Sequence, residues 1–193
     1  AKRAVSLWAG PKKGRMVMTS SAGIYLETEG GVVDEESPVD SSSPRTAKLK
    51  GCEDAVLGAG GSVVRLAGLY ALDRGAHSFW IKGGKCTGVK GGLVGLVSYE
   101  DSASSVLSCL TCERGVEGEV FVVADGAEQT REQIVDSALK TKMWGGFARP
   151  VFEEAGDPLH AKGIGKRYNV AKIGTTGWVP KYPSFDAFCE LNK

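Results

Sequence analysis

Three continuous apolar runs alternate with helix-like segments along most of this chain. The runs cover residues 15–19, residues 62–66 with an extension toward 70, and residues 119–123. Strands covered on both faces show such unbroken apolar runs, whereas half-exposed strands alternate. The pattern predicts β–α units around one mostly parallel sheet, in which all three runs lie and the first two are parallel.

Capping residues mark the start of each helix between these runs. Ser43 precedes a proline, which is favoured at the first helical position, and Ser98 and Thr130 begin two further helices. Residues 4–8 predict one more short helix, which a Gly-Pro pair ends. In the helix after Ser98, the apolar residues fall on one face: Ala103, Val106, Leu107 and Leu110.

Glycine-rich segments predict the connections. The stretch 83–95 contains Gly91-Gly92, a turn sequence suited to a small hairpin. From about residue 155 the chain is rich in Lys, Gly and Pro, which indicates a loop-rich tail rather than a separate domain. Within this tail the basic segment 162–167 lacks Walker spacing and a following helix, so we interpret it as an exposed basic loop. We therefore expect a single domain over residues 1–193.

Charge and hydropathy exclude several function classes. Lys+Arg 24 against Asp+Glu 23 leaves a net charge of +1, so no global field attracts nucleic acid or an anionic membrane. No run approaches the roughly 18 apolar residues of a spanning helix, although docking to a membrane complex through a protein surface stays open. The five cysteines are an odd number, which favours reduced thiols and an intracellular compartment. No targeting segment indicates a plastid or a mitochondrion.

Residues suited to metal or redox chemistry are sparse. Cys109 and Cys112 have CxxC spacing but no second pair or nearby histidine, so we interpret them as helix packing. His77 and His160 lack companions at ligand spacing, and we expect both in surface or loop positions. We predict no metal site. Three aromatic residues either cover the sheet or form an exposed patch that docks a partner: Trp144, Phe147 and Phe152.

Five motifs in order resemble those of the NAD-dependent epimerase/dehydratase family, the extended short-chain dehydrogenases. They are TSSAGIY at 19–25, RLAGLY at 65–70, VSYED at 97–101, GEVFVVADG at 118–126 and GWVPKYPS at 177–184. The resemblance covers the C-terminal portion of that family and implies a Rossmann-like α/β fold, a mostly parallel sheet flanked by helices. It also implies that Ser21 matches the family's substrate-orienting serine. By the same resemblance, Ala67 and Gly68 lie near the nicotinamide of NAD(P).

Two departures separate the chain from that family. The positions of the family's catalytic tyrosine and lysine hold Arg45 and Leu49. A guanidinium stays protonated near neutral pH and leucine carries no charge, so neither can transfer the proton. The family's first strands, with the TGxxGxxG loop that holds a pyrophosphate, have no counterpart here. We therefore expect no cofactor for this chain, and an unpaired sheet edge that a protein partner covers.

Three residues of the resembling segments keep two interpretations each. Ser21 is either the remnant of a site or a hydroxyl that bonds the backbone at a strand end. Tyr25 either substitutes for the missing acid or packs beneath the loop, and packing is favoured. Arg45 either binds a phosphate or carboxylate or is solvated in a first helical turn, and solvation is favoured.

Two functions fit these observations. The first, which we favour, is a catalytically degenerate relative that serves as a structural or docking subunit of a larger assembly. The second is an NAD(P)-dependent oxidoreductase or epimerase whose N-terminal cofactor-binding half is missing from the sequence. The loss of the tyrosine, lysine and glycine-rich loop indicates the first. The start at Ala1, without a methionine and inside a helical pattern, indicates the second.

Overall fold

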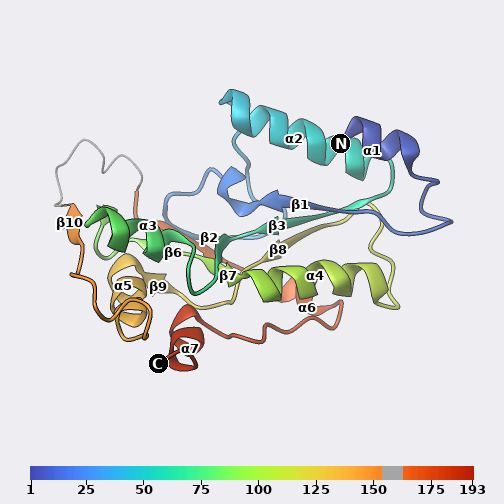
Figure 1. The fold of residues 1–193 in the computed structure, drawn as a ribbon. Coiled ribbons are helices and arrows are strands. Elements are labelled where there is room, and N and C mark those ends of the chain that lie inside the picture. Colours follow the sequence, from blue (N-terminus) through green and yellow to red (C-terminus); the bar gives the residue numbers. More distant parts are fainter. Residues whose placement is uncertain (154–162) are drawn as a thin grey trace.

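A three-stranded parallel sheet lies at the centre of the computed structural model, which describes residues 1–153 and 163–193 (Figure 1). Its strands are β1 (Val17–Ser21), β3 (Ser62–Leu66) and β8 (Val120–Val123), with β3 in the middle. The prediction that the three apolar runs share one sheet is confirmed, and so is the parallel pairing of the first two. The first strand begins two residues later than the apolar run suggested.

Helices cover both faces of this sheet. The helix α2 (Pro44–Leu57) lies on one face with the short α1 (Lys2–Leu7) beside it, and α4 (Tyr99–Thr111) lies on the other (Figure 1). Every residue of β3 is buried as a result. This explains why β3 is mostly apolar, with Arg65 as its single charged residue. The fold is therefore the α/β, Rossmann-like class that the sequence predicts.

The other strands form four two-stranded pairs. Three pairs are parallel and one is antiparallel. The parallel pairs are β4 (Gly68–Tyr70) with β7 (Leu96–Ser98), β5 (Lys85–Val89) with β10 (Val151–Glu153), and β2 (Glu29–Val33) with β11 (Gly165–Tyr168); the antiparallel pair is β6 (Leu93–Val94) with β9 (Gln129–Thr130).

The hairpin expected over residues 83–95 is wrong. Its two strands, β5 and β6, pair with β10 and β9 and not with each other. The turn itself is present, since Gly92 N donates to Val89 O at 2.9 Å. The Arg131 side chain lies against this turn, where a Cβ on Gly92 would come within 1.8 Å of its Nη1. Strands that are distant in the sequence, β10 and β9, therefore determine how β5 and β6 pair, although the local turn forms.

The predicted helix starts are confirmed by their caps. Ser43 Oγ accepts from Thr46 N at 3.1 Å, and Ser98 Oγ accepts from Asp101 N at 2.8 Å. Thr130 forms a complete capping box at the start of the next helix. The remaining helices are the 3-10 turn η1 (Ala22–Ile24), α3 (Ala76–Gly83), α5 (Arg131–Leu139), α6 (Ala171–Gly174) and α7 (Phe185–Glu190).

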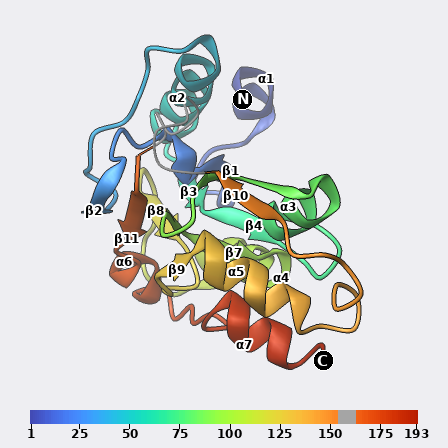
Figure 2. The same cartoon turned by 90° about the vertical axis from the view of Figure 1, so that its left-hand side faces the viewer.

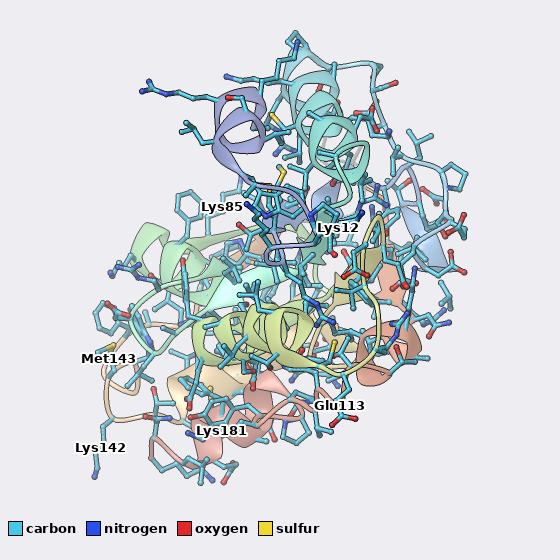
Figure 3. All side chains as sticks on the ribbon, turned by 90° about the vertical axis from the view of Figure 1, so that its right-hand side faces the viewer. Lys12, Lys85, Glu113, Lys142, Met143 and Lys181 are labelled. Atoms are coloured by element: carbon cyan, nitrogen blue, oxygen red, sulfur yellow. The ribbon has the colours of Figure 1, made fainter. Side chains whose placement is uncertain are left out.

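The apolar face of α4 points away from the sheet, contrary to the usual arrangement. Leu107 is 58% exposed and Leu110 is 39% exposed, whereas Ser102, Ser105 and Cys109 are buried. Small side chains on the buried face let the helix lie close to the strands, and their hydroxyls bond backbone carbonyls one turn earlier. Figure 3 shows this helix toward the viewer, with Glu113 just beyond its C-terminal end. Cys109 therefore serves packing, as its place in the helix indicated.

The expectation that His77 is a surface residue is wrong. It lies in α3 with its ring buried, 4.7 Å from the ring of Phe185 and 5.8 Å from that of Trp144. Its Nε2 is 3.2 Å from Leu72 O, and burial lowers its pKa. A single histidine gives no periodic signal, so the sequence could not place it. His160 lies outside the described residues.

The aromatic cluster proposed from the sequence is divided. Trp144 is buried and donates Nε1 to Leu72 O at 2.7 Å, so it covers the core. Phe147 contacts its ring at 5.2 Å but remains half exposed, and Phe152 is partly buried.

The described residues offer little for membrane insertion or metal binding. None of their helices combines the length and hydrophobicity that crossing a bilayer requires. None of their His, Cys, Asp and Glu side chains gather in a cluster able to hold a metal ion. All five cysteines are free thiols.

Candidate functional site

A cleft of about 280 Å³ opens at the carboxyl ends of β1 and β3, the end of the strands that Figure 2 views. Ligands of open α/β sheets bind at this edge, because the chain leaves each strand there and the loops diverge. One wall consists of Ser21 at the end of β1 and Gly23 just after it, together with residues 66–68, which run from the end of β3 to the start of β4. The cleft is therefore the candidate functional site.

Strands β6 and β11 form the opposite wall. They approach so closely that two glycines are required. A Cβ on Gly95 would lie 2.1 Å from the ring of Tyr168, and one on Gly165 would lie 2.2 Å from Leu93 O. Gly165 also adopts a φ of +104°, which other residues rarely tolerate. These contacts fix Tyr168 and its neighbour Lys166 in the wall of the cleft.

The structure brings together Ser21, Ala67 and Gly68, the three residues that the family resemblance singled out. All three line the cleft. Ser21 Oγ also accepts from Gly23 N at 3.2 Å, so the hydroxyl bonds backbone at the strand end while it faces the cleft. The two interpretations of Ser21 are compatible in this geometry.

Arg45 and Leu49 lie elsewhere, in the first two turns of α2, and neither belongs to the cleft lining. Arg45 is exposed and Leu49 is partly buried. The charge of Arg45 acts on nearby Asp40, whose pKa is lowered chiefly by hydrogen bonds from Ser42. The solvated interpretation of Arg45 matches this position.

Tyr25 is buried in a polar network beneath β1 and β3. Arg65 Nη1 donates to its hydroxyl at 3.0 Å, and burial raises the pKa of the phenol. The same guanidinium donates to both carboxylate oxygens of Glu53, at 2.8 and 3.2 Å, and Ser20 Oγ donates to one of them. Tyr25 is also absent from the cleft lining, so it fits the packing interpretation and not that of a substitute acid.

Sequence reasoning missed Lys166 and Tyr168. It treated 162–167 as an exposed basic loop. This is wrong for the residues after 164, because they form β11 beside β2 and are partly buried. Lys162 lies outside the described residues. The available signal was the spacing: residues 166 and 168 are two apart and so share one face of a strand.

Lys166 is a half-buried cation. Its Nζ donates to Tyr25 O at 2.6 Å. Burial lowers its pKa, and the more distant charge of Glu27 opposes this effect. Across the described residues, its ammonium forms no ion pair. Burial raises the pKa of Tyr168 beside it to about 12.

The outer edge of β1 is a second distinctive feature. The hydrogen bond from Ser62 N to Met16 O shows that even-numbered residues face β3. Backbone groups alternate in direction along a strand, so those of Val17 and Thr19 point outward. Within the described residues β1 pairs only with β3. A groove of about 370 Å³ follows this edge. Mostly apolar residues line it, from α1, β1 and α2 and from Ala1 and Met16 just before the first two, and Thr19 is polar.

The opposite edge of the sheet is protected. Val122 N, which points away from β3, donates to the Glu35 side chain at 2.9 Å. This carboxylate therefore occupies one outward amide of β8, where an added strand would otherwise pair.

The fold is similar to that of solved NAD-dependent epimerases and dehydratases. A UDP-glucuronic acid 4-epimerase from Bacillus cereus, in complex with UDP-glucuronic acid and NAD, matches 92% of this chain with a TM-score of 0.74 and 15% identity. A dTDP-glucose 4,6-dehydratase from Bacillus anthracis, in complex with NAD, matches 92% with a TM-score of 0.68 and 18% identity. A functionally unknown conserved protein from Silicibacter pomeroyi matches 90% with a TM-score of 0.72 and 24% identity.

The chain spans 60–64% of the length of these three structures. At such identities the similarity establishes the fold, and the partial coverage agrees with a resemblance to one portion of the family. No protein-family model matches the sequence, and no curated protein matches it significantly.

Proposed function

We propose that this epimerase/dehydratase-like chain is catalytically degenerate and acts as a structural or docking subunit of a larger protein assembly. The observation that carries the proposal is the open edge of β1 with its apolar groove, next to a cleft from which the family's acid and base are missing. The partner need not have a sequence like that of β1. Any extended segment with apolar side chains can pair with this edge.

The side chains of the cleft support the proposal that it has no catalytic activity. Ser21 can orient a carbonyl group but cannot exchange a proton near neutral pH without a partner. The two positions that carry proton transfer in the family hold Arg45 and Leu49, which lie outside the cleft lining. A positioned acid or base contributes about 10²–10⁴-fold to such reactions, and this contribution is missing here.

The described residues could provide one part of a dinucleotide site, the cleft, but not the turn that binds the pyrophosphate. The neighbours from Bacillus contain NAD. In this chain Ser21, Ala67 and Gly68 could contact a ring-sized group at the cleft, but no described segment forms a glycine-rich turn before a helix that could hold a pyrophosphate. The alternative function, an NAD(P)-dependent oxidoreductase or epimerase, requires that another polypeptide segment supplies this turn.

Hydrogen exchange tests the open edge. In the purified chain the amides of Val17 and Thr19 should exchange orders of magnitude faster than those of Val63 and Val64 in the central strand, because no described strand pairs with the outer edge of β1. In the native assembly, isolated from its source, the two outward amides should become protected. Equal exposure of Val17 and Thr19 in the assembly would rule out docking through this edge.

Restoring the family pair tests the degenerate site. The double substitution Arg45→Tyr and Leu49→Lys should create no hydride transfer with NAD(H) or NADP(H), and titration calorimetry should detect no binding of either to the purified chain. The stability should change by only about 1 kcal/mol, since Arg45 is exposed and Leu49 only partly buried. Saturable micromolar binding, or activity in the double variant, would favour the enzyme instead.

A further inference from the structure

The cleft holds a positive charge that the proposed function does not use. Lys166 and Arg131 contribute to its lining, and none of the described lining residues is a carboxylate. They come from β11 and the first turn of α5, so the fold brings them together from distant parts of the chain. Neither belongs to the five motifs that resemble the family.

Among the described residues, Lys166 has no carboxylate partner of the kind that a half-buried ammonium normally has. Its one hydrogen-bond acceptor among the described residues is the carbonyl oxygen of Tyr25. An ammonium has three donors, and burying a charge is costly unless an opposite charge compensates for it. Glu27, the acid whose charge reaches it, is instead bonded to the amides of Glu29 and Gly31.

The remaining lining gives the cleft a partly apolar character. Leu66, Leu93 and Val94 are apolar, and Tyr168 contributes a partly buried aromatic ring. The volume of about 280 Å³ lies just below the range of typical small-molecule sites. A compact carbon skeleton fits this volume.

We infer that the cleft binds a small monocarboxylate, with the anion on Lys166 near Ser21 and an apolar body against Tyr168. Arg131 also lines the cleft, and its Nη1 donates to Val89 O at 3.5 Å. This site is independent of the open edge of β1 and would exist in a chain that has no enzymatic activity.

Titration calorimetry of the whole chain with sodium benzoate tests this inference. Benzoate should bind saturably with a dissociation constant of about 1 mM, as expected for a ligand of its size. Benzamide, which has the same shape without the charge, and inorganic phosphate, which has charge without an apolar body, should bind at least about tenfold more weakly. Equal affinity for benzoate and benzamide, or no saturation with benzoate, would overturn the site.

Substitutions of Lys166 test whether the benzoate carboxylate binds this residue. Lys166→Met should weaken benzoate binding at least about tenfold, the usual effect of losing a hydrogen bond to a charged group. Lys166→Arg should retain most of the affinity, and Lys48→Met, at an exposed lysine of α2, should leave it unchanged. Wild-type affinity in Lys166→Met would refute the role of this residue.

A second measurement does not depend on the stability of any variant. Reductive methylation of the wild-type chain, mapped by mass spectrometry, should show that benzoate slows modification of Lys166 but not of Lys48. Unchanged modification of Lys166 at saturating benzoate would place the ligand elsewhere and contradict the inference.

Discussion

Replacing Arg65 by methionine is expected to lower the free energy of unfolding by about 3–5 kcal/mol. The substitution leaves the Glu53 carboxylate, whose side chain is 0% exposed, without its bidentate partner. A buried pair that loses one member usually costs this much, because the remaining charge is uncompensated. Urea unfolding followed by circular dichroism measures the change.

The matched double substitution separates charge from packing. Adding Glu53→Gln to Arg65→Met removes the buried charge and should recover at least half of the loss. Arg45→Met, at an exposed arginine of α2, should change stability by no more than about 0.5 kcal/mol. If Arg65→Met costs as little as Arg45→Met, the network does not stabilise the fold.

The second large effect concerns Asp125, a buried carboxyl at the end of β8. Its Oδ1 accepts from Ala127 N at 3.0 Å, whereas Oδ2 has no partner among the described residues. Burial raises the pKa of Asp125 to about 7, and the negative charge of Asp101 adds to this. Tyr70 is also buried there. Burial is the main cause of the raised pKa of Tyr70, and the negative charge of Asp125 is the second.

The sign of the pH dependence follows from this rise. The contribution of Asp125 to stability is fully present below the pKa of the unfolded chain, near 4, and is lost as pH rises through about 7. Three pKa units correspond to roughly 4 kcal/mol, which is an upper limit. Asp125→Asn should remove this decline, so the difference in unfolding free energy between wild type and variant should change by up to about 3 kcal/mol, roughly two to two and a half pKa units, from pH 4.5 to pH 8.

Comparing the two proteins at each pH isolates Asp125 from other acids. Glu27, Asp40 and Glu132 have lowered pKa values, mainly because hydrogen bonds stabilise their charged forms, and they act with the opposite sign. They cancel in the difference. Asp73→Asn, at an exposed aspartate, should leave the wild-type profile unchanged. A constant difference between Asp125→Asn and wild type would show that Asp125 ionises normally.

Signals confined to a few residues predicted their parts of the structure well. The apolar runs gave the three central strands, and Ser43, Ser98 and Thr130 gave helix starts whose caps are all formed. The caps report contacts within about four residues, and the apolar runs report burial on both faces of a strand, so both signals can be read directly from the sequence. The resemblance added Ser21, Ala67 and Gly68, because these follow strands whose ends meet at one edge.

Contacts between distant residues required the folded chain. The outward apolar face of α4 depends on how closely small side chains let it approach the sheet, and the pairing of β5 with β10 joins residues 66 positions apart, from Lys85 to Val151. The cleft is completed by Lys166, which bonds Tyr25 across 141 residues of sequence. No local periodicity encodes such a contact, since it arises only when independently formed strands pack. The sequence thus determined which strands and helices form and which residues, Arg45 and Leu49, stand where the family that it resembles has its tyrosine and lysine. Tertiary packing decided which described charges line the cleft and which edge of the sheet stays open.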